Sequence, residues 1–240
     1  MNISHKTILI TGANRGIGWA LVNEALKRGA KKVYAGTRGP LRVRDERVSP
    51  VTLDVTSDSE IRRAVDELDT LDVLINNAGI SLQDDLSNLS MIHQHLAVNC
   101  FALVNVTRAF LPLLTRSKGA VVNILSLASI ASVPFSPAYA MSKAAALSAT
   151  QSLRMLLARK GITVQAVFPG PVDTDMTRDL ELPKASAESV ALAIFDGLEN
   201  GDEDIFPDSM SQPLAEAWRT GAVKALECQF TALVPQGATN

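Results

Sequence analysis

The sequence predicts an α/β protein built on one doubly wound parallel sheet of about seven strands, with helices on both faces of the sheet. Short β-branched runs alternate along the chain with longer stretches of helical periodicity. Most of these runs are continuously apolar, as strands are when both faces of a sheet are covered. The chain has 240 residues, 47% of them apolar, and no internal repeat or linker, so we expect a single domain over 1–240.

The individual elements follow from this alternation, in chain order. Strands are expected at 6–11, 32–37, 51–54, 72–77, 120–125 and 163–168, with a short "DIF" strand at 204–206. Helices are expected near 16–28, 58–68, 89–116, 137–160, 186–199 and 211–229. The interval 38–51 is short and carries Pro40, which makes a full helix there doubtful.

Helix boundaries are marked by capping residues. The stretch "SDSE" at 57–60 is a capping box, in which a serine and a glutamate each satisfy a free backbone N–H. Ser136 is expected to cap the helix that begins with Pro137, and Gly161 to end it.

Composition restricts the partners. The formal net charge of −2 argues against a nucleic acid or an anionic membrane as a partner, since either would need a basic face. We find no leader-like segment and no apolar run of membrane-spanning length. Cys100 and Cys228 are far apart and form no metal-binding or redox pattern, so we expect a cytoplasmic location. His93 and His95 would point to different faces of a helix, so we predict no metal site.

The glycine-rich segment "TGANRGIG" (11–18) joins the first strand to the first helix. Gly12 allows the tight turn, Gly16 a close approach of backbone to a diphosphate, and Gly18 close packing of helix on strand. The free N–H groups at the helix N-terminus then favour phosphate. This context predicts a dinucleotide site in a Rossmann-type sheet.

The spacing of this turn, together with "NNAG" (76–79) and "FPGPVDT" (168–174), resembles the short-chain dehydrogenase/reductase family in its short form. The resemblance runs from about residue 5 to residue 175, which implies a cofactor-binding core over 5–175. A substrate lid and a C-terminal segment would then occupy 175–240, and the family pattern weakens there.

The choice of dinucleotide can be argued from charge. Thr37 stands where an NAD-binding protein usually has an acid, and Arg38 follows it. Arg15 lies inside the glycine turn, and two guanidinium groups suit a 2′-phosphate, so we predict NADP(H). Arg42, Arg44 and Arg47 are interpreted as a solvated loop. The residue pattern and the resemblance together imply cofactor contacts from Gly12, Asn14, Arg15, Gly16, Ile17, Gly18, Thr37, Arg38, Asp54, Val55, Asn77, Ala78, Gly79, Tyr139, Lys143, Pro169, Gly170, Val172 and Thr174.

Tyr139 and Lys143 lie four residues apart, on one helix face. Alone, the pair is more typical of an ordinary helix surface. Ser126 ends the fifth strand and Asn99 interrupts an apolar helix, and the four residues match the family's catalytic tetrad. The resemblance implies that Ser126 binds a carbonyl oxygen, that Tyr139 transfers the proton and that Asn99 holds a water. Lys143 is expected to lower the pKa of Tyr139.

The chain is therefore predicted to be an NADPH-dependent carbonyl reductase or alcohol dehydrogenase that acts on a small ketone, aldehyde or secondary alcohol. Apolar residues around the site (Leu127, Phe135, Met176, Leu180, Leu182) suggest substrates with apolar groups. A 3-oxoacyl-[acyl-carrier-protein] reductase and a non-catalytic NADP(H)-binding regulator remain alternatives, while the Tyr–Lys spacing counts against an enoyl reductase. By analogy with the family, we expect a homodimer or homotetramer formed through the helices that carry Asn99 and Tyr139.

Overall fold

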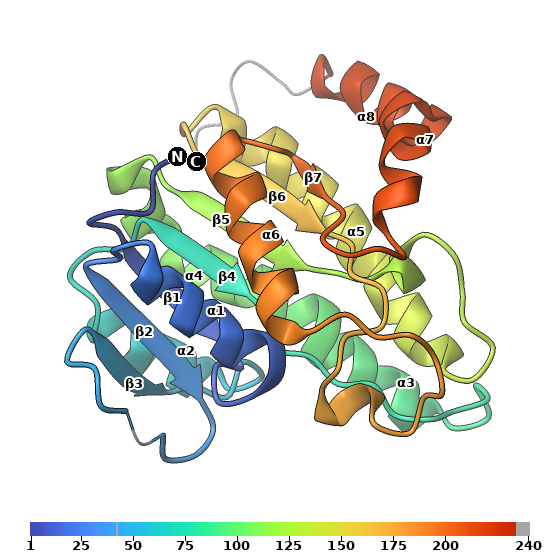
Figure 1. The fold of residues 1–240 in the computed structure, drawn as a ribbon. Helices are drawn as coiled ribbons and strands as arrows, with labels where there is room; N and C mark the ends of the chain where they lie inside the picture. The colour runs from blue at the N-terminus through green and yellow to red at the C-terminus, as the bar shows by residue number, and fades with distance from the viewer. Residues whose placement is uncertain (42, 234–240) are drawn as a thin grey trace.

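The computed structural model of the chain describes residues 1–41 and 43–233, and its centre is a seven-stranded sheet (Figure 1). The strand order is β3-β2-β1-β4-β5-β6-β7, and every neighbouring pair is parallel. The strands are β1 (Thr7–Thr11), β2 (Lys32–Thr37), β3 (Val48–Thr52), β4 (Val73–Asn76), β5 (Ala120–Ile124), β6 (Thr163–Val167) and β7 (Asp204–Ile205). The predicted doubly wound parallel sheet is confirmed.

Helices cover both faces of this sheet. Successive strand residues point to opposite faces, and both faces carry apolar side chains that pack against helices. Ile8 and Ile10 of β1 pack in the core layer of α1 and α6, whereas Leu9 packs in the layer of α2 and α4. Figure 1 shows α1 and α6 together in front of the sheet. The helices are α1 (Gly16–Lys27), α2 (Asp58–Asp66), α3 (Leu89–Leu96), α4 (Ala102–Ser117), α5 (Pro137–Ala158), α6 (Ala187–Asn200), α7 (Ala215–Thr220) and α8 (Ala222–Thr231).

The third strand begins three residues and ends two residues earlier than the sequence predicts, over Val48–Thr52 rather than 51–54. Ser49 and Pro50 made the start of this strand hard to predict, because proline has no N–H to donate to the hydrogen bonds between strands. β3 is the edge strand of the sheet and pairs only with β2, so the missing N–H of Pro50 can face away from the ladder.

Two predicted helices are divided. The run expected at 89–116 is α3, a π-helical segment over Ala97–Phe101, and α4. The helix expected at 211–229 is a 3₁₀ turn (Gln212–Leu214) followed by α7 and α8, which are separated by Gly221 in an extended conformation. The capping box at Ser57 is half formed, because Glu60 accepts from the Asp54 N–H at 2.6 Å instead.

By length and composition, the helical run Leu89–Ser117 could cross a membrane, although we expected no run of that length. Val106, Phe110 and Leu114 from this run are fully buried against the sheet. The core helix of a folded domain can have the same length and composition, and this packing is that of a core helix. The predicted division at residue 175 stays a prediction, and residues 234–240 of the C-terminal segment lie outside the described residues.

Candidate active site

A cleft of about 480 Å³ opens at the carboxyl ends of the strands, where the chain order reverses between β1 and β4. This is the edge at which open α/β sheets bind ligands. All the residues predicted to contact the cofactor line this cleft. Met176, expected near the substrate, lines the cleft as well. Sequence reasoning missed further lining residues, which mostly flank the motifs and carry little chemical signal of their own: Leu53, Thr56, Ile80, Gln94, Ala97, Val98, Ile124, Leu125, Asp175 and Thr177.

The glycine turn has the geometry that a diphosphate needs. Gly12 and Gly16 have φ values of +65° and +52°, a region that side chains rarely adopt. A Cβ on Gly18 would lie 2.2 Å from the carbonyl oxygen of Gly12, so only glycine fits there. No side chain caps the N-terminus of α1, which leaves its first N–H groups for a ligand. These residues fit the diphosphate of a dinucleotide.

The end of β2 is suited to a phosphate rather than to a bare ribose. Thr37 is buried and donates to the Gly39 carbonyl, and the Arg38 side chain is exposed on the cleft wall. Asp54 accepts bonds from the Thr56 hydroxyl and N–H, and with the Arg38 charge these hold the pKa of Asp54 below its usual value.

The other arginines of this region have separate surroundings. Arg44 is exposed and Arg47 pairs with Asp45 at 2.7 Å, as expected for a solvated loop, whereas Arg42 lies outside the described residues.

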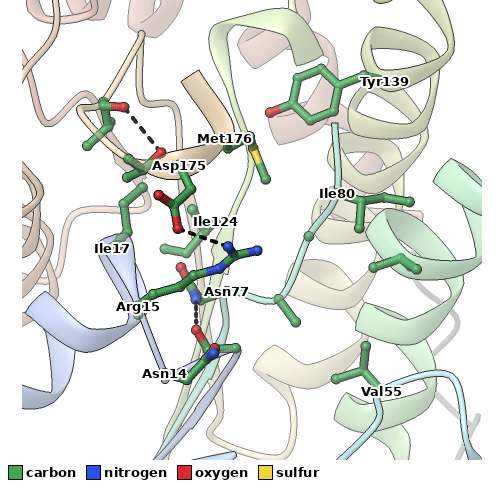
Figure 2. A pocket seen from close by; sticks show the side chains of 18 of the residues that line it. Asn14, Arg15, Ile17, Val55, Asn77, Ile80, Ile124, Tyr139, Asp175 and Met176 are labelled. Atoms are coloured by element: carbon green, nitrogen blue, oxygen red, sulfur yellow. Dashed lines mark hydrogen bonds and ion pairs between the residues drawn. The ribbon is translucent and has the colours of Figure 1, made fainter. Parts of the chain in front are cut away.

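Arg15 has a partner that the sequence did not reveal. Its Nη1 donates to the Asp175 carboxylate at 2.9 Å, across the mouth of the cleft (Figure 2). Asp175 follows β6 and also accepts from Arg178. The predicted contact of Arg15 with a 2′-phosphate stays a prediction.

Tyr139, Ser126 and Lys143 form the candidate catalytic group. Tyr139 and Lys143 come from the first turns of α5, and the Lys143 Nζ lies 5.8 Å from the centre of the Tyr139 ring. The Ser126 side chain lies beside the Tyr139 hydroxyl and acts to lower the pKa of Tyr139. Lys143 is buried and donates to the Ile124 carbonyl at 2.7 Å. The three side chains thus lie at the carboxyl end of β5.

The pKa values differ from the expectation for Tyr139. Burial raises the pKa of Tyr139, and the hydrogen bond with Ser126 opposes this rise only in part. Burial also lowers the pKa of Lys143, to about 8. The predicted lowering of the Tyr139 pKa by Lys143 stays a prediction, since the net rise reflects burial, which disfavours the phenolate.

Ser126 is held by a reciprocal turn after β5. Its hydroxyl accepts from the Ala128 N–H at 3.1 Å, and its own N–H donates to the Ser129 hydroxyl at 3.2 Å. These bonds fix the serine side chain beside Tyr139 without help from helix α5.

Asn99 lies in the π-helical turn, a distortion that often marks functional sites. Its amide exchanges bonds of 2.9 Å with the backbone of Ile80 and donates to the Ser142 hydroxyl at 2.8 Å. Asn99 and Lys143 both line a small cavity of about 10 Å³. That volume is near the minimum of roughly 10–15 Å³ that one water needs. The predicted water site therefore has a place, although its occupant stays a prediction.

The start of α5 is capped by a residue far away in sequence. Ser136 was predicted to be the cap, but its hydroxyl donates to the Leu82 carbonyl at 2.9 Å. The Asp84 carboxylate instead accepts from the Ala138 N–H at 3.1 and 3.2 Å. The loop that follows β4 therefore sets the position of Tyr139. Pro137 is in the first turn, as predicted.

No group of metal-ligating side chains is found among the described residues. His95 is buried, accepts from the Leu82 N–H at 3.0 Å and contacts the Met91 carbonyl, and His93 is exposed. His95 is thus a satisfied core histidine that holds the same loop as Asp84.

Comparison with known proteins agrees with this geometry. The family model for short chain dehydrogenase matches residues 6–185. The chain belongs to this family. Short-chain dehydrogenases are oxidoreductases, and the chain is 30% identical to the ketoacyl reductase HetN of a Nostoc species, over 90% of this chain and 82% of that protein. A short chain dehydrogenase from Burkholderia cenocepacia, solved with NADP, is 34% identical, with a TM-score of 0.87 over 98% of this chain and all of that one. A short-chain dehydrogenase from Sphingobium yanoikuyae, solved with NADPH, is 26% identical, with a TM-score of 0.81 over 98% of both chains.

Proposed function

We propose that this short-chain dehydrogenase is an NADPH-dependent carbonyl reductase, which in reverse oxidises a secondary alcohol. The observation that carries the proposal is the grouping of Ser126 and buried Lys143 around Tyr139, with Tyr139 and Lys143 on the wall of the nucleotide cleft. Hydride transfer requires a bound nicotinamide cofactor. The glycine turn and the N-terminus of α1 fit the diphosphate of such a cofactor.

NADP(H) is favoured over NAD(H) by the groups at the end of β2. Arg38 lines the cleft there, and Thr37 stands in place of the acid that would hold a ribose 2′-hydroxyl. A guanidinium group binds a phosphate by charged, bidentate hydrogen bonds. The NADP and NADPH in the two similar solved proteins support the same choice.

The residues of the chain then have distinct roles. When bound, the nicotinamide cofactor supplies the hydride. Ser126 hydrogen-bonds the substrate carbonyl oxygen and stabilises the negative charge that develops there. Tyr139 donates its phenolic proton to that oxygen as general acid. Lys143 provides a positive charge beside Tyr139, and Asn99 lines the small cavity through which the proton is replaced.

The substrates are proposed to be ketones or aldehydes with apolar groups. Phe135 and Leu182 expose large apolar side chains on the loop before α5 and on the lid, and Met176 exposes one in the cleft. Turnover with NADPH and with NADH should be compared across ketones, aldehydes, quinones and ketoacyl thioesters. Tight NADPH binding without turnover of any of them would favour the non-catalytic regulator.

Replacing Tyr139 by phenylalanine removes the proposed proton donor but keeps the ring. We expect kcat to fall by about 10²–10⁴-fold, the usual contribution of general acid catalysis. NADPH affinity, measured by nucleotide fluorescence, should fall far less than kcat, because the ring that lines the cleft is kept. Tyr34→Phe is the matched control, because Tyr34 lies in β2 and has no proposed role. Near-normal kcat in Tyr139→Phe would overturn the mechanism.

A 3-oxoacyl-[acyl-carrier-protein] reductase is the second candidate, favoured by the likeness to HetN across most of the chain. A ketoacyl thioester that is reduced much faster than simple ketones would support it. We also propose a cytoplasmic location, since Cys100 and Cys228 are both free thiols. Recovery of the protein in the membrane fraction of lysed cells would contradict that location.

A further inference from the structure

Arg15 belongs to the glycine turn and pairs with the first residue of the predicted substrate lid, which begins at residue 175. It is the residue before the first turn of α1, and its guanidinium pairs with Asp175 at 2.9 Å. Asp175 begins the short 3₁₀ turn Asp175–Thr177 after β6. Figure 2 shows the Arg15 side chain reaching across the cleft mouth to this carboxylate. The pair therefore links two segments that lie far apart in the sequence.

The sheet order places Arg38 and Asp175 on opposite sides of β1. β2, which ends at Thr37 and Arg38, lies on one side of β1, whereas β4, β5 and β6 lie on the other side. Arg15 therefore pairs with a residue that lies on the opposite side of β1 from Arg38. A 2′-phosphate bound at Arg38 would attract the exposed Arg15 guanidinium away from Asp175.

We propose that Asp175 determines cofactor affinity by competing with the 2′-phosphate of NADP(H) for Arg15. This inference rests on the proposed use of NADP(H). NAD(H) has no 2′-phosphate and does not need Arg15 at the end of β2. Asp175 thus lowers the affinity for NADP(H) selectively, and binding of NADP(H) separates the lid from the glycine turn.

Little free energy is needed for Arg15 to exchange Asp175 for a 2′-phosphate. The Arg15 and Asp175 side chains are 68% and 46% exposed, and exposed ion pairs are weak. When Arg15 leaves, Asp175 keeps its ion pair with Arg178. Neither Arg15 nor Asp175 is left buried and unpaired, so the lid can alternate between a state with the Arg15–Asp175 ion pair and a state without it.

A binding cycle on the protein without substrate tests the competition. The dissociation constants of NADP⁺ and NAD⁺ are measured by calorimetry at low salt for wild type, Asp175→Asn, Arg15→Gln and the double variant. We expect Asp175→Asn to tighten NADP⁺ binding by about two- to five-fold, the range for an exposed pair. NAD⁺ binding should stay unchanged, and Asp175→Asn should have no effect in the Arg15→Gln background.

Asp179→Asn is the matched control. Asp179 lies in the same lid, is exposed and forms no ion pair within residues 1–41 and 43–233, so its removal changes net charge alone. Equal tightening by both substitutions, equal effects on NADP⁺ and NAD⁺, or tightening that persists without Arg15 would each overturn the competition. Wild-type protein that binds NAD⁺ but not NADP⁺ would overturn the proposed cofactor as well, which separates the two failures.

Discussion

Lys143 is the residue whose environment has the clearest consequence for activity. It is buried, and its one hydrogen-bond acceptor among the described residues is the neutral carbonyl of Ile124. Since no carboxylate of residues 1–41 and 43–233 pairs with the ammonium group, burial lowers the pKa of Lys143 to about 8. A lysine with a lowered pKa loses its proton earlier as the pH rises, so the positive charge beside Tyr139 is present only below about pH 8.

We predict that kcat for ketone reduction at saturating NADPH falls as the pH rises through about 8. Lys143→Arg should move this fall to a much higher pH, because a guanidinium group stays charged there. Both profiles of kcat against pH are measured by NADPH absorbance between pH 6 and 10. A flat wild-type profile up to pH 10 would show that the Lys143 charge is not required.

Helix α8 is attached to the body by charges rather than by apolar contacts. Its Lys224 and Glu227 face inward, where Glu227 pairs with Arg154 of α5 and Lys224 lies 2.8 Å from Asp204 of β7. The Trp218 indole of α7 also donates to Asp204, at 3.0 Å. Burial opposes the charge of Asp204, but Arg154 and Lys224 keep its pKa below the usual value. The packing of α8 therefore depends on Arg154.

Replacing Arg154 by methionine leaves two buried carboxylates short of a partner. We expect the free energy of unfolding to fall by about 3 kcal/mol, since breaking a buried ion pair is costly. Arg219→Met removes an exposed pair with Glu216 and should cost less than about 1 kcal/mol. Both values come from urea denaturation. Equal losses in the two variants would mean that the Arg154 ion pairs contribute no more than a surface pair.

At the scale of the whole molecule, the outer surface of α4 and α5 suggests how copies of the chain associate. Phe101, at the start of α4, and Met141 and Leu156 of α5 expose large apolar side chains. We propose that a dimer or tetramer forms through these two helices, which are the ones that carry or adjoin Asn99 and Tyr139.

Leu156→Glu should weaken this association, because it would bury a charge in an apolar contact. We expect its mass in solution, measured by light scattering after gel filtration, to be lower than that of the wild type at the same concentration. Leu192→Glu makes the same substitution at another exposed leucine, on helix α6 outside the proposed interface. This variant should keep the wild-type mass. A monomeric wild-type protein would contradict the proposed assembly.

Sequence reasoning succeeded where the signal is local. The apolar runs of β1, β4 and β5 and the spacing of Gly12, Gly16 and Gly18 are set by neighbouring residues. It misplaced β3, because Pro50 is unfavourable in most strands and is tolerated at an edge, which only the sheet order reveals.

By itself the sequence determined the doubly wound sheet, the cofactor cleft and the candidate tetrad, since these depend on periodicity and on motifs within short segments. Only the tertiary structure decided which polar groups from distant segments pair with one another. Asp84 replaces Ser136 as the cap of α5, and Asp175 engages Arg15 from a distant loop. Burial in the folded chain, rather than the Tyr–Lys spacing, sets the pKa of Tyr139 and Lys143. Such effects depend on distances and exclusion of water, which exist only once the chain is folded.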